Sequence, residues 1–315
     1  MSGSSNLKNN ACLRNLLVFI AKSLQTMETV KKADDLVTNR LARVKGFSWQ
    51  AGEKVSRSSG FIDLAQYFAK KAETIDSIKC VRADSKLTEF VIAACMLSKK
   101  SLSHLDETIQ DEIIENLIDF KKLKNVEYVK SLEQRYFLTS GDSLGGSMRN
   151  AIGQAAQTRL TETIIAKLEA QGDSPRRVKN PSGKTTAIIW PDRRIIFDKK
   201  PSFIGKSIDI IVVRGASAKS GNIENASDYV CCGELKGGID PAGADEHWKT
   251  AKTALDRIHG AFMAGRGPNL VFLGSAIEQS MAQEIFALMG SGWLAGACNI
   301  NYAHQYNEMI DIIAS

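Results

Sequence analysis

The sequence predicts an α+β protein in which an all-α N-terminal domain precedes an α/β sandwich with a mixed central sheet. Proline is absent from the first 140 of the 315 residues, and that half carries apolar residues at three- and four-residue spacings. Beyond it, short β-rich runs are followed by alternating helical and strand-like segments. The length suits about two domains, and we place them at residues 1–140 and 141–315.

Helical periodicity organises the first domain. The apolar spacing is helical in residues 61–78, 87–97 and 109–120. Asp84 and Ser103 are possible helix starts. Residues 140–150 hold three glycines and predict a turn that opens the second domain. A long amphipathic helix should follow, reaching Gln171 and ending at Gly172.

The second domain then alternates between strand and helix signals. Four β-rich runs are predicted at Thr185 to Trp190, Arg194 to Phe197, Ser207 to Val213 and Tyr229 to Lys236. Pro191 and Asp192 predict the turn between the first two runs. A helix, a strand and a helix are expected over residues 245–263, 269–273 and 277–289. This order differs from the regular alternation of a doubly wound sheet.

Charge, cysteine content and apolar runs indicate which partner and which cellular compartment the sequence favours. The net charge of +6 and the pI near 8.9 modestly favour a polyanionic partner. The six cysteines form no CxxC pair, so we expect free thiols in a reducing cytoplasm. The apolar run at residues 16–21 is too short for a signal-peptide core, and no stretch is long enough for a membrane span.

Three residues could act together on a phosphate. Glu234 and Lys236 lie two apart on a predicted strand and therefore share one face, with roughly 6.5–7 Å of rise between them. Asp209 interrupts an apolar strand, where a lone carboxylate is costly to bury unless it meets a cation. If the two strands are neighbours, Asp209 and Glu234 converge into a site for a hard cation such as Mg²⁺. Lys236 would then face the scissile phosphate of a phosphodiester.

The same residues could instead form a surface ion-pair ladder between antiparallel strands. Two features favour a phosphodiesterase site: the apolar strand around Asp209, and Gly237-Gly238, which would let backbone approach a ligand closely. His247, near the start of the next helix, could take a proton from the attacking water. A helix-surface histidine beside Trp248 explains it equally well.

The run from Pro181 to Thr186 invites comparison with a phosphate-binding loop. The P-loop pattern requires a glycine at position 178, where Val178 stands, and Gly183 precedes a strand instead of a helix. We therefore predict a turn, one that could contact a DNA phosphate. Lysines and arginines surround it, which suits backbone contacts and equally suits a solvated loop.

Two longer segments carry a resemblance to a known family. The run from Gly233 to Ala251 (GELKGGIDPAGADEHWKTA) and the run from Gly141 to Asn150 (GDSLGGSMRN) resemble the AvaI/BsoBI family of type II restriction endonucleases. The resemblance is strongest from about residue 135 to 290. It implies a PD-(D/E)xK core with an added helical domain that embraces DNA, and a homodimer around the duplex.

The resemblance also implies an activity. It predicts Mg²⁺-dependent cleavage of double-stranded DNA within C(C/T)CG(A/G)G, after the first C, leaving four-base 5′ overhangs. Such an enzyme serves host restriction-modification defence in the bacterial cytoplasm, with a cognate methyltransferase as its genetic partner and no membrane. Two alternatives remain: a structure-specific repair or recombination nuclease of the same fold, and a DNA-binding protein without catalysis.

Residue by residue, the resemblance assigns roles to matching positions. Asp209 and Glu234 correspond to the metal carboxylates, with the backbone carbonyl of Leu235 as a further ligand, Lys236 to the catalytic lysine and His247 to the general base. Asp240 corresponds to an acidic residue that approaches bases, and a carboxylate can accept a hydrogen bond from cytosine N4. Lys100 is the nearest match to a base-reading lysine. The proline of the nominal motif is missing, because Ser207-Ile208 precede Asp209.

Overall fold

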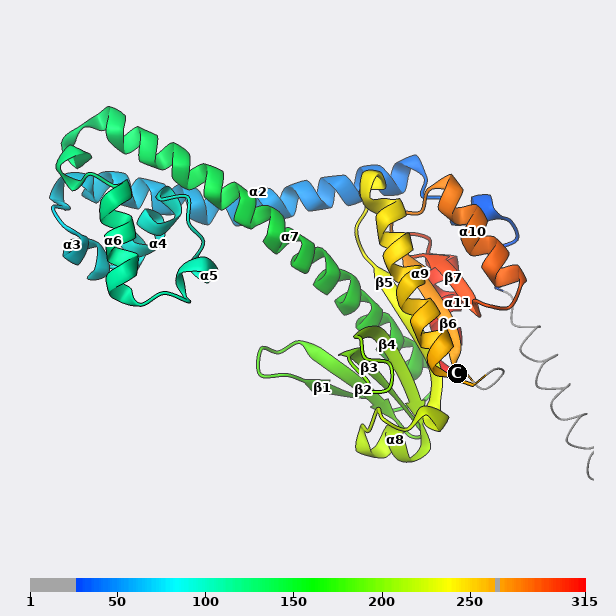
Figure 1. Cartoon of the computed structure of the whole chain (residues 1–315). Coiled ribbons are helices and arrows are strands. Elements are labelled where there is room, and N and C mark those ends of the chain that lie inside the picture. Colours follow the sequence, from blue (N-terminus) through cyan, green and yellow to red (C-terminus); the bar gives the residue numbers. More distant parts are fainter. Residues whose placement is uncertain (1–26, 264–266) are drawn as a thin grey trace, which may run out of the picture. The chain divides into compact units, whose positions relative to one another are not determined.

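The computed structural model describes residues 27–263 and 267–315, which fold into two compact units (Figure 1). The helical unit is Ser48–Ala151. The sheet unit combines the residues up to Phe47 with Ile152–Ser315. This division differs from the predicted one at residue 140, because residues 27–47 pack with the sheet and the C-terminal boundary falls inside a long helix.

The helical unit is built around a stacked aromatic core. Its elements are α3 (Ile78–Arg82), α4 (Ser85–Ala94), α5 (Lys99–Leu102), α6 (Glu107–Leu117) and parts of α2 (Arg40–Lys71) and α7 (Val126–Ala170). The ring of Phe90 stacks on Phe68 at 3.9 Å and on Tyr136 at 4.5 Å between centroids. Asp84 caps α4 as predicted, whereas α6 is capped by Asp106 and not by Ser103.

The predicted turn at residues 140–150 was wrong, because α7 continues through this segment. Its glycines keep ordinary helical backbone, and a β-carbon added at Gly141 or Gly145 would meet no atom within 4 Å. Glycine only weakens a helix. On either side α7 buries Tyr136 in the helical unit and Leu160 in the sheet unit, and this burial outweighs the cost of the glycines.

A seven-stranded mixed sheet forms the second unit, with spatial order β1 to β7. The strands are β1 (Arg176–Lys179), β2 (Thr185–Trp190), β3 (Arg193–Lys199), β4 (Ile208–Arg214), β5 (Tyr229–Lys236), β6 (Asn269–Gly274) and β7 (Gly296–Asn299). Neighbours from β1 to β5 are antiparallel, and β5, β6 and β7 are parallel. The mixed α+β fold predicted from the sequence is confirmed.

Helices cover the sheet and complete its core. They are α9 (Ala244–Ala261), α10 (Gln279–Gly290), α11 (Ala303–Ala314) and the C-terminal part of α7, with a short α8 (Gly215–Ser220) after β4. Figure 1 shows α9 lying along β5 and β6, where Trp248 and Leu255 are buried. The buried apolar residues of α7, α9, α10 and α11 form one cluster with those of the strands. Buried residues of β4 and β5 belong to this cluster, which holds the two strands in place.

The cysteines of the described residues are free thiols, as the sequence predicted. Cys80, Cys95, Cys231, Cys232 and Cys298 are all free thiols, and Cys12 lies outside the described residues. The apolar run at residues 16–21 also lies outside them. None of the helices in the described part combines the length and the apolar character needed to cross a bilayer.

Candidate active site

The two predicted carboxylates lie on neighbouring strands. β4 and β5 pair antiparallel with Ile210 opposite Gly233, so Asp209 and Glu234 come next to each other in the same register. Side chains opposite each other in an antiparallel pair share a face of the sheet. The condition on which the sequence prediction depended, that the two strands are neighbours, is met.

Lys236 joins the two carboxylates into one cluster. Its Nζ donates to Glu234 Oε2 at 2.6 Å and to Asp209 Oδ2 at 3.1 Å. The same Asp209 oxygen accepts a hydrogen bond from the backbone N–H of Leu235 at 2.9 Å. Glu234 is buried, and Asp209 and Lys236 are partly buried. An ion-pair ladder on the surface would leave all three side chains in water, so burial favours the predicted site over that alternative.

Burial and crowding perturb the titration of the cluster. Burial, and then the nearby charge of Asp209, raise the pKa of Glu234 to about 7, although Lys236 opposes the shift. Burial lowers the pKa of Lys236, but the two carboxylates outweigh it and raise that pKa above its ordinary value. Each carboxylate therefore makes the other harder to ionise, and the Lys236 ammonium between them favours their charged forms.

The cluster offers the donors that Mg²⁺ prefers. Asp209 and Glu234 supply hard carboxylate oxygens on one face. In an antiparallel ladder the N–H and C=O of one residue point toward the same neighbouring strand, so the Leu235 carbonyl faces the edge where Asp209 lies. No group of three or more His, Cys, Asp or Glu gathers anywhere in residues 27–263 and 267–315. Mg²⁺ fits such a sparse site because it retains waters and takes phosphate oxygens.

The two glycines after Lys236 permit close packing. A β-carbon at Gly237 would stand 2.6 Å from Ala156 Cβ and 3.1 Å from the Ile152 carbonyl of α7. A β-carbon at Gly238 would stand 3.1 Å from the ring of His247. The sequence suggested that these glycines admit a ligand. In the structure, helix α7 packs against Gly237 and the imidazole of His247 packs against Gly238. This packing fixes the end of β5.

His247 and Asp240 both follow the catalytic strand. The exposed imidazole of His247 projects from the first turn of α9 over Gly238, two residues past Lys236. Asp240 is exposed and caps the short 3-10 turn Pro241–Gly243, where its Oδ1 accepts from the Ala242 N–H at 3.0 Å. Its second oxygen is not used by this cap. Asp240 therefore belongs to the loop that leads away from the cluster, and His247 to the first turn of the helix that follows this loop.

Lys100 lies apart from these residues in the chain's other unit. It is exposed on the short helix α5, and its carbonyl accepts a hydrogen bond from Ser103 Oγ at 2.8 Å. The structure thus brings together Asp209, Glu234 and Lys236, and places Asp240 in the loop after them and His247 in the first turn of α9. It assigns Lys100 to the helical unit, where its role stays a prediction.

A supporting network at the end of β5 has no signal in the sequence. The Lys236 carbonyl accepts from the Ser275 N–H at 2.9 Å, and the Ser275 carbonyl accepts from Thr38 Oγ1 at 2.9 Å. The buried amide of Asn299 donates to the same Thr38 oxygen at 2.8 Å. Residues more than 200 positions apart meet here, so no local pattern could have predicted the contact.

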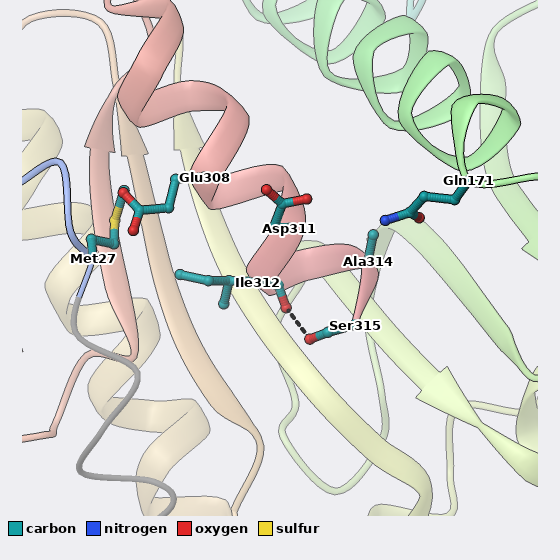
Figure 2. A pocket seen from close by; sticks show the side chains of 7 residues that line it. All are labelled: Met27, Gln171, Glu308, Asp311, Ile312, Ala314 and Ser315. Atoms are coloured by element: carbon teal, nitrogen blue, oxygen red, sulfur yellow. Dashed lines mark hydrogen bonds between the residues drawn. The ribbon is translucent and has the colours of Figure 1, made fainter.

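Other cavities lie in the sheet unit. One of about 480 Å³ lies beside the C-terminal end of α11 (Figure 2). Its two carboxylates are already engaged: Glu308 accepts hydrogen bonds from the backbone of Glu28 and Thr29, and Asp311 pairs with Lys167 at 2.5 Å. None of the residues that line this cavity belongs to the cluster on β4 and β5.

Comparison with known proteins decides which family has this arrangement. A family model described as restriction endonuclease BsobI matches residues 26–195 and 189–314. The chain belongs to this family. The BsoBI restriction endonuclease family was also the one that the sequence motifs indicated, and that resemblance is confirmed.

Full-length relatives agree with the family model. The type II restriction enzyme AvaI of Nostoc sp. (strain PCC 7120) is 34% identical over 298 residues, which cover 88% of this chain and 95% of that protein. AvaI of Anabaena variabilis gives the same values. The type II restriction enzyme BsoBI of Geobacillus stearothermophilus is 33% identical over 306 residues, covering 89% of this chain and 95% of BsoBI. Both units of this BsoBI-family chain therefore fall within the similarity.

Proposed function

We propose that this BsoBI-family protein hydrolyses phosphodiester bonds of double-stranded DNA at a specific site. The observation that carries the proposal is the buried cluster of Asp209, Glu234 and Lys236 on adjacent strands of a restriction-endonuclease chain. Its relatives are type II restriction enzymes. The same kinship supports a role in host defence in the bacterial cytoplasm, beside a cognate methyltransferase.

Each residue of the cluster has a distinct task. Asp209, Glu234 and the Leu235 carbonyl would hold Mg²⁺, which when bound polarises phosphoryl oxygens as a Lewis acid. Lys236 places a positive charge where negative charge develops on the phosphate in the transition state. His247, in the first turn of α9, takes the proton from the attacking water. The packing of α7 against Gly237 holds Lys236 in place while this happens.

Base recognition is proposed for residues outside the cluster. The free oxygen of Asp240 can accept a hydrogen bond from a cytosine amine, and Lys100 can donate to guanine. With AvaI and BsoBI as relatives, we propose C(C/T)CG(A/G)G as the site, cut after the first C. A homodimer would present the same residues to both halves of this palindrome.

Digestion of plasmid DNA of known sequence tests the proposal. With Mg²⁺ present, we expect discrete fragments whose 5′ ends map to the first C of the proposed site, and no cleavage in excess EDTA. A smear would indicate a structure-specific nuclease. Binding without any cutting would indicate a DNA-binding module. Cleavage that persists in EDTA would contradict the role given to Asp209 and Glu234.

A further inference from the structure

A second polar pocket lies between α7 and the hairpin formed by β1 and β2. Its volume is about 210 Å³, several times the roughly 30 Å³ that one water molecule occupies in the liquid. One wall is the polar stripe of α7 that includes Gln157 and Thr161, and the other carries Arg177, Lys179 and Lys184 from the hairpin. All of these residues belong to the sheet unit.

Thr161 leaves a buried polar group without a partner. Its side chain is 2% exposed, and no group in the described residues forms a hydrogen bond with its hydroxyl. Thr163, two residues further along α7, donates to the Arg159 carbonyl at 2.8 Å, as helical threonines commonly do. Buried polar atoms are rarely unsatisfied in a folded protein. Thr161 is one of the residues that line the pocket, so its unpaired hydroxyl lies in the wall against which a ligand would bind.

The charge of the pocket selects an anion. Three cations line it, and two of them are paired with exposed carboxylates, Arg177 with Glu162 and Lys184 with Asp198, so the net charge is that of Lys179. Lys184 extends from the turn, where its Nζ contacts Asp198 at 2.7 Å. Hydroxyl and amide donors beside ammonium groups are the set that binds phosphate oxygens.

The pocket lies at the same end of the sheet as the catalytic cluster. Lys179 pairs with Thr185, and Lys199 of β3 pairs with Ile208, the residue before Asp209. Four strand spacings separate β1 from β5, which is about 19 Å measured across the sheet. Helix α7 also links the two places, because Ala156 contacts Gly237 and the next residue, Gln157, lines the pocket.

We propose that this pocket binds one backbone phosphate of the DNA strand that enters the catalytic cluster. A span of about 19 Å across the sheet corresponds to about six base pairs at 3.4 Å each. The contact would fix the register of the strand without reading its bases. The inference rests on the proposed function, because the phosphate belongs to the substrate.

Single neutral phosphates in the duplex give a direct test. A methylphosphonate would be placed in turn at each backbone position within about six base pairs of the scissile bond, with Ca²⁺ replacing Mg²⁺, and the affinity measured by fluorescence anisotropy. We expect the wild-type protein to lose roughly tenfold at one contacted position. Thr161→Val and Lys184→Gln should bind unmodified DNA more weakly than the wild type. A methylphosphonate at that same position should not reduce the affinity of these variants further.

Matched variants separate the pocket from general effects. Thr163→Val makes the same substitution two residues away, and Lys219→Gln removes one positive charge on α8, outside the pocket. Both should retain the wild-type response to the modified phosphate. If Thr161→Val and Lys184→Gln bind every duplex as the wild type does, the pocket does not hold a DNA phosphate.

Inorganic phosphate distinguishes the source of the ligand. If millimolar phosphate raises the melting temperature of the wild type but not of Thr161→Val, while no methylphosphonate position responds to the variants, the pocket binds a free anion and the DNA assignment is overturned. A wild-type protein that binds no duplex would contradict the proposed function itself. Normal binding and cutting by the pocket variants would contradict only the present inference.

Discussion

At the residue scale, the position of one lysine explains most of the candidate chemistry. Lys236 bonds both carboxylates, and their charges keep it protonated although it is largely buried. Without it, Asp209 and Glu234 would repel each other at close range. The cluster thus carries its own cation, which a hard metal ion can replace while the ammonium turns to the substrate.

Replacing His247 tests the proton-transfer role. His247→Ala should slow cleavage by roughly 10²-fold to 10⁴-fold, which is the usual contribution of a positioned base. His259→Ala is the matched control, because His259 lies on the same helix and packs on Trp293, far along the chain from the loop. Single-turnover rates measure both. Equal rates for wild type and His247→Ala would exclude His247 from the mechanism.

Gly237 tests whether strand placement matters for catalysis. Gly237→Ala would force a methyl group to within 2.6 Å of Ala156 Cβ and 3.1 Å of the Ile152 carbonyl. Since backbone cannot yield easily there, we expect Lys236 to shift and the cleavage rate to fall at least about tenfold. Gly237→Ala combined with Ala156→Gly should recover part of the rate. No loss in the single variant would show that this packing is dispensable.

Several site residues could be predicted from the sequence and others could not. The two-residue spacing of Glu234 and Lys236 fixes a shared face, and an acid within an apolar strand marks Asp209. Thr38, Ser275 and Asn299 hold the end of β5, but they meet only through the tertiary fold. The phosphate pocket also combines a helix and a hairpin whose pairing no local pattern specifies.

At the element scale, the central strands were predictable and the edge strands were not. The runs that became β2, β3 and β4 each contain more than one β-branched residue, and those of β5 and β6 are mostly apolar. β1 is the polar sequence Arg-Arg-Val-Lys, and β7 is the small-residue sequence Gly-Ala-Cys-Asn, so neither shows alternation. Both are edges of the sheet and depend on a single neighbour. Tertiary pairing decided their structure.

Alanine in the middle of α7 tests the corrected helix. Because Gly141 has helical backbone and open space around its Cα, Gly141→Ala should stabilise the protein by about 0.5–1 kcal/mol. Urea unfolding measures the change. Gly172→Ala is the contrasting variant. Gly172 has a φ of +88°, which alanine adopts with strain, so this substitution should destabilise the protein. A loss of stability at Gly141 would favour the turn expected from the sequence.

The start of α4 gives a pH-dependent prediction. The hydroxyl of Tyr67 and then the ammonium of Lys71 hold the pKa of Asp84 well below its ordinary value of 3.8. A lowered folded pKa contributes stability that is complete above the ordinary pKa and is lost as the pH falls through the folded pKa. Asp84→Asn, which keeps a capping side chain, should lower the melting temperature by a few degrees at pH 7.

The difference in melting temperature should shrink on acidification. As the pH falls below 3.8 toward the lowered pKa of Asp84 in the folded protein, the stability that its charge contributes is lost, so the two proteins should converge. Asp106→Asn is the control, because Asp106 caps α6 without a salt bridge among the described residues. A difference that stays constant from pH 7 to about pH 2 would show that the charge of Asp84 is not what stabilises α4.

At the scale of the whole molecule, the residues proposed to act on DNA lie in both units of the chain. The sheet unit carries the cluster, the adjacent loop and the polar pocket, all at one end of β1 to β5. The helical unit carries Lys100 on an exposed short helix. A divided arrangement of this kind lets one unit hold the chemistry on rigid strands while the other contributes further contacts to the substrate.

Cutting and binding measured on the same duplex test the central claim most directly. Lys236→Ala and wild type would be incubated with a duplex that carries one C(C/T)CG(A/G)G site and with a matched duplex that lacks it. We predict that Lys236→Ala retains preferential binding to the site but loses roughly 10³-fold or more of the Mg²⁺-dependent cleavage rate. Cleavage by Lys236→Ala at a near wild-type rate would contradict the assignment of the Asp209, Glu234 and Lys236 cluster as the active site.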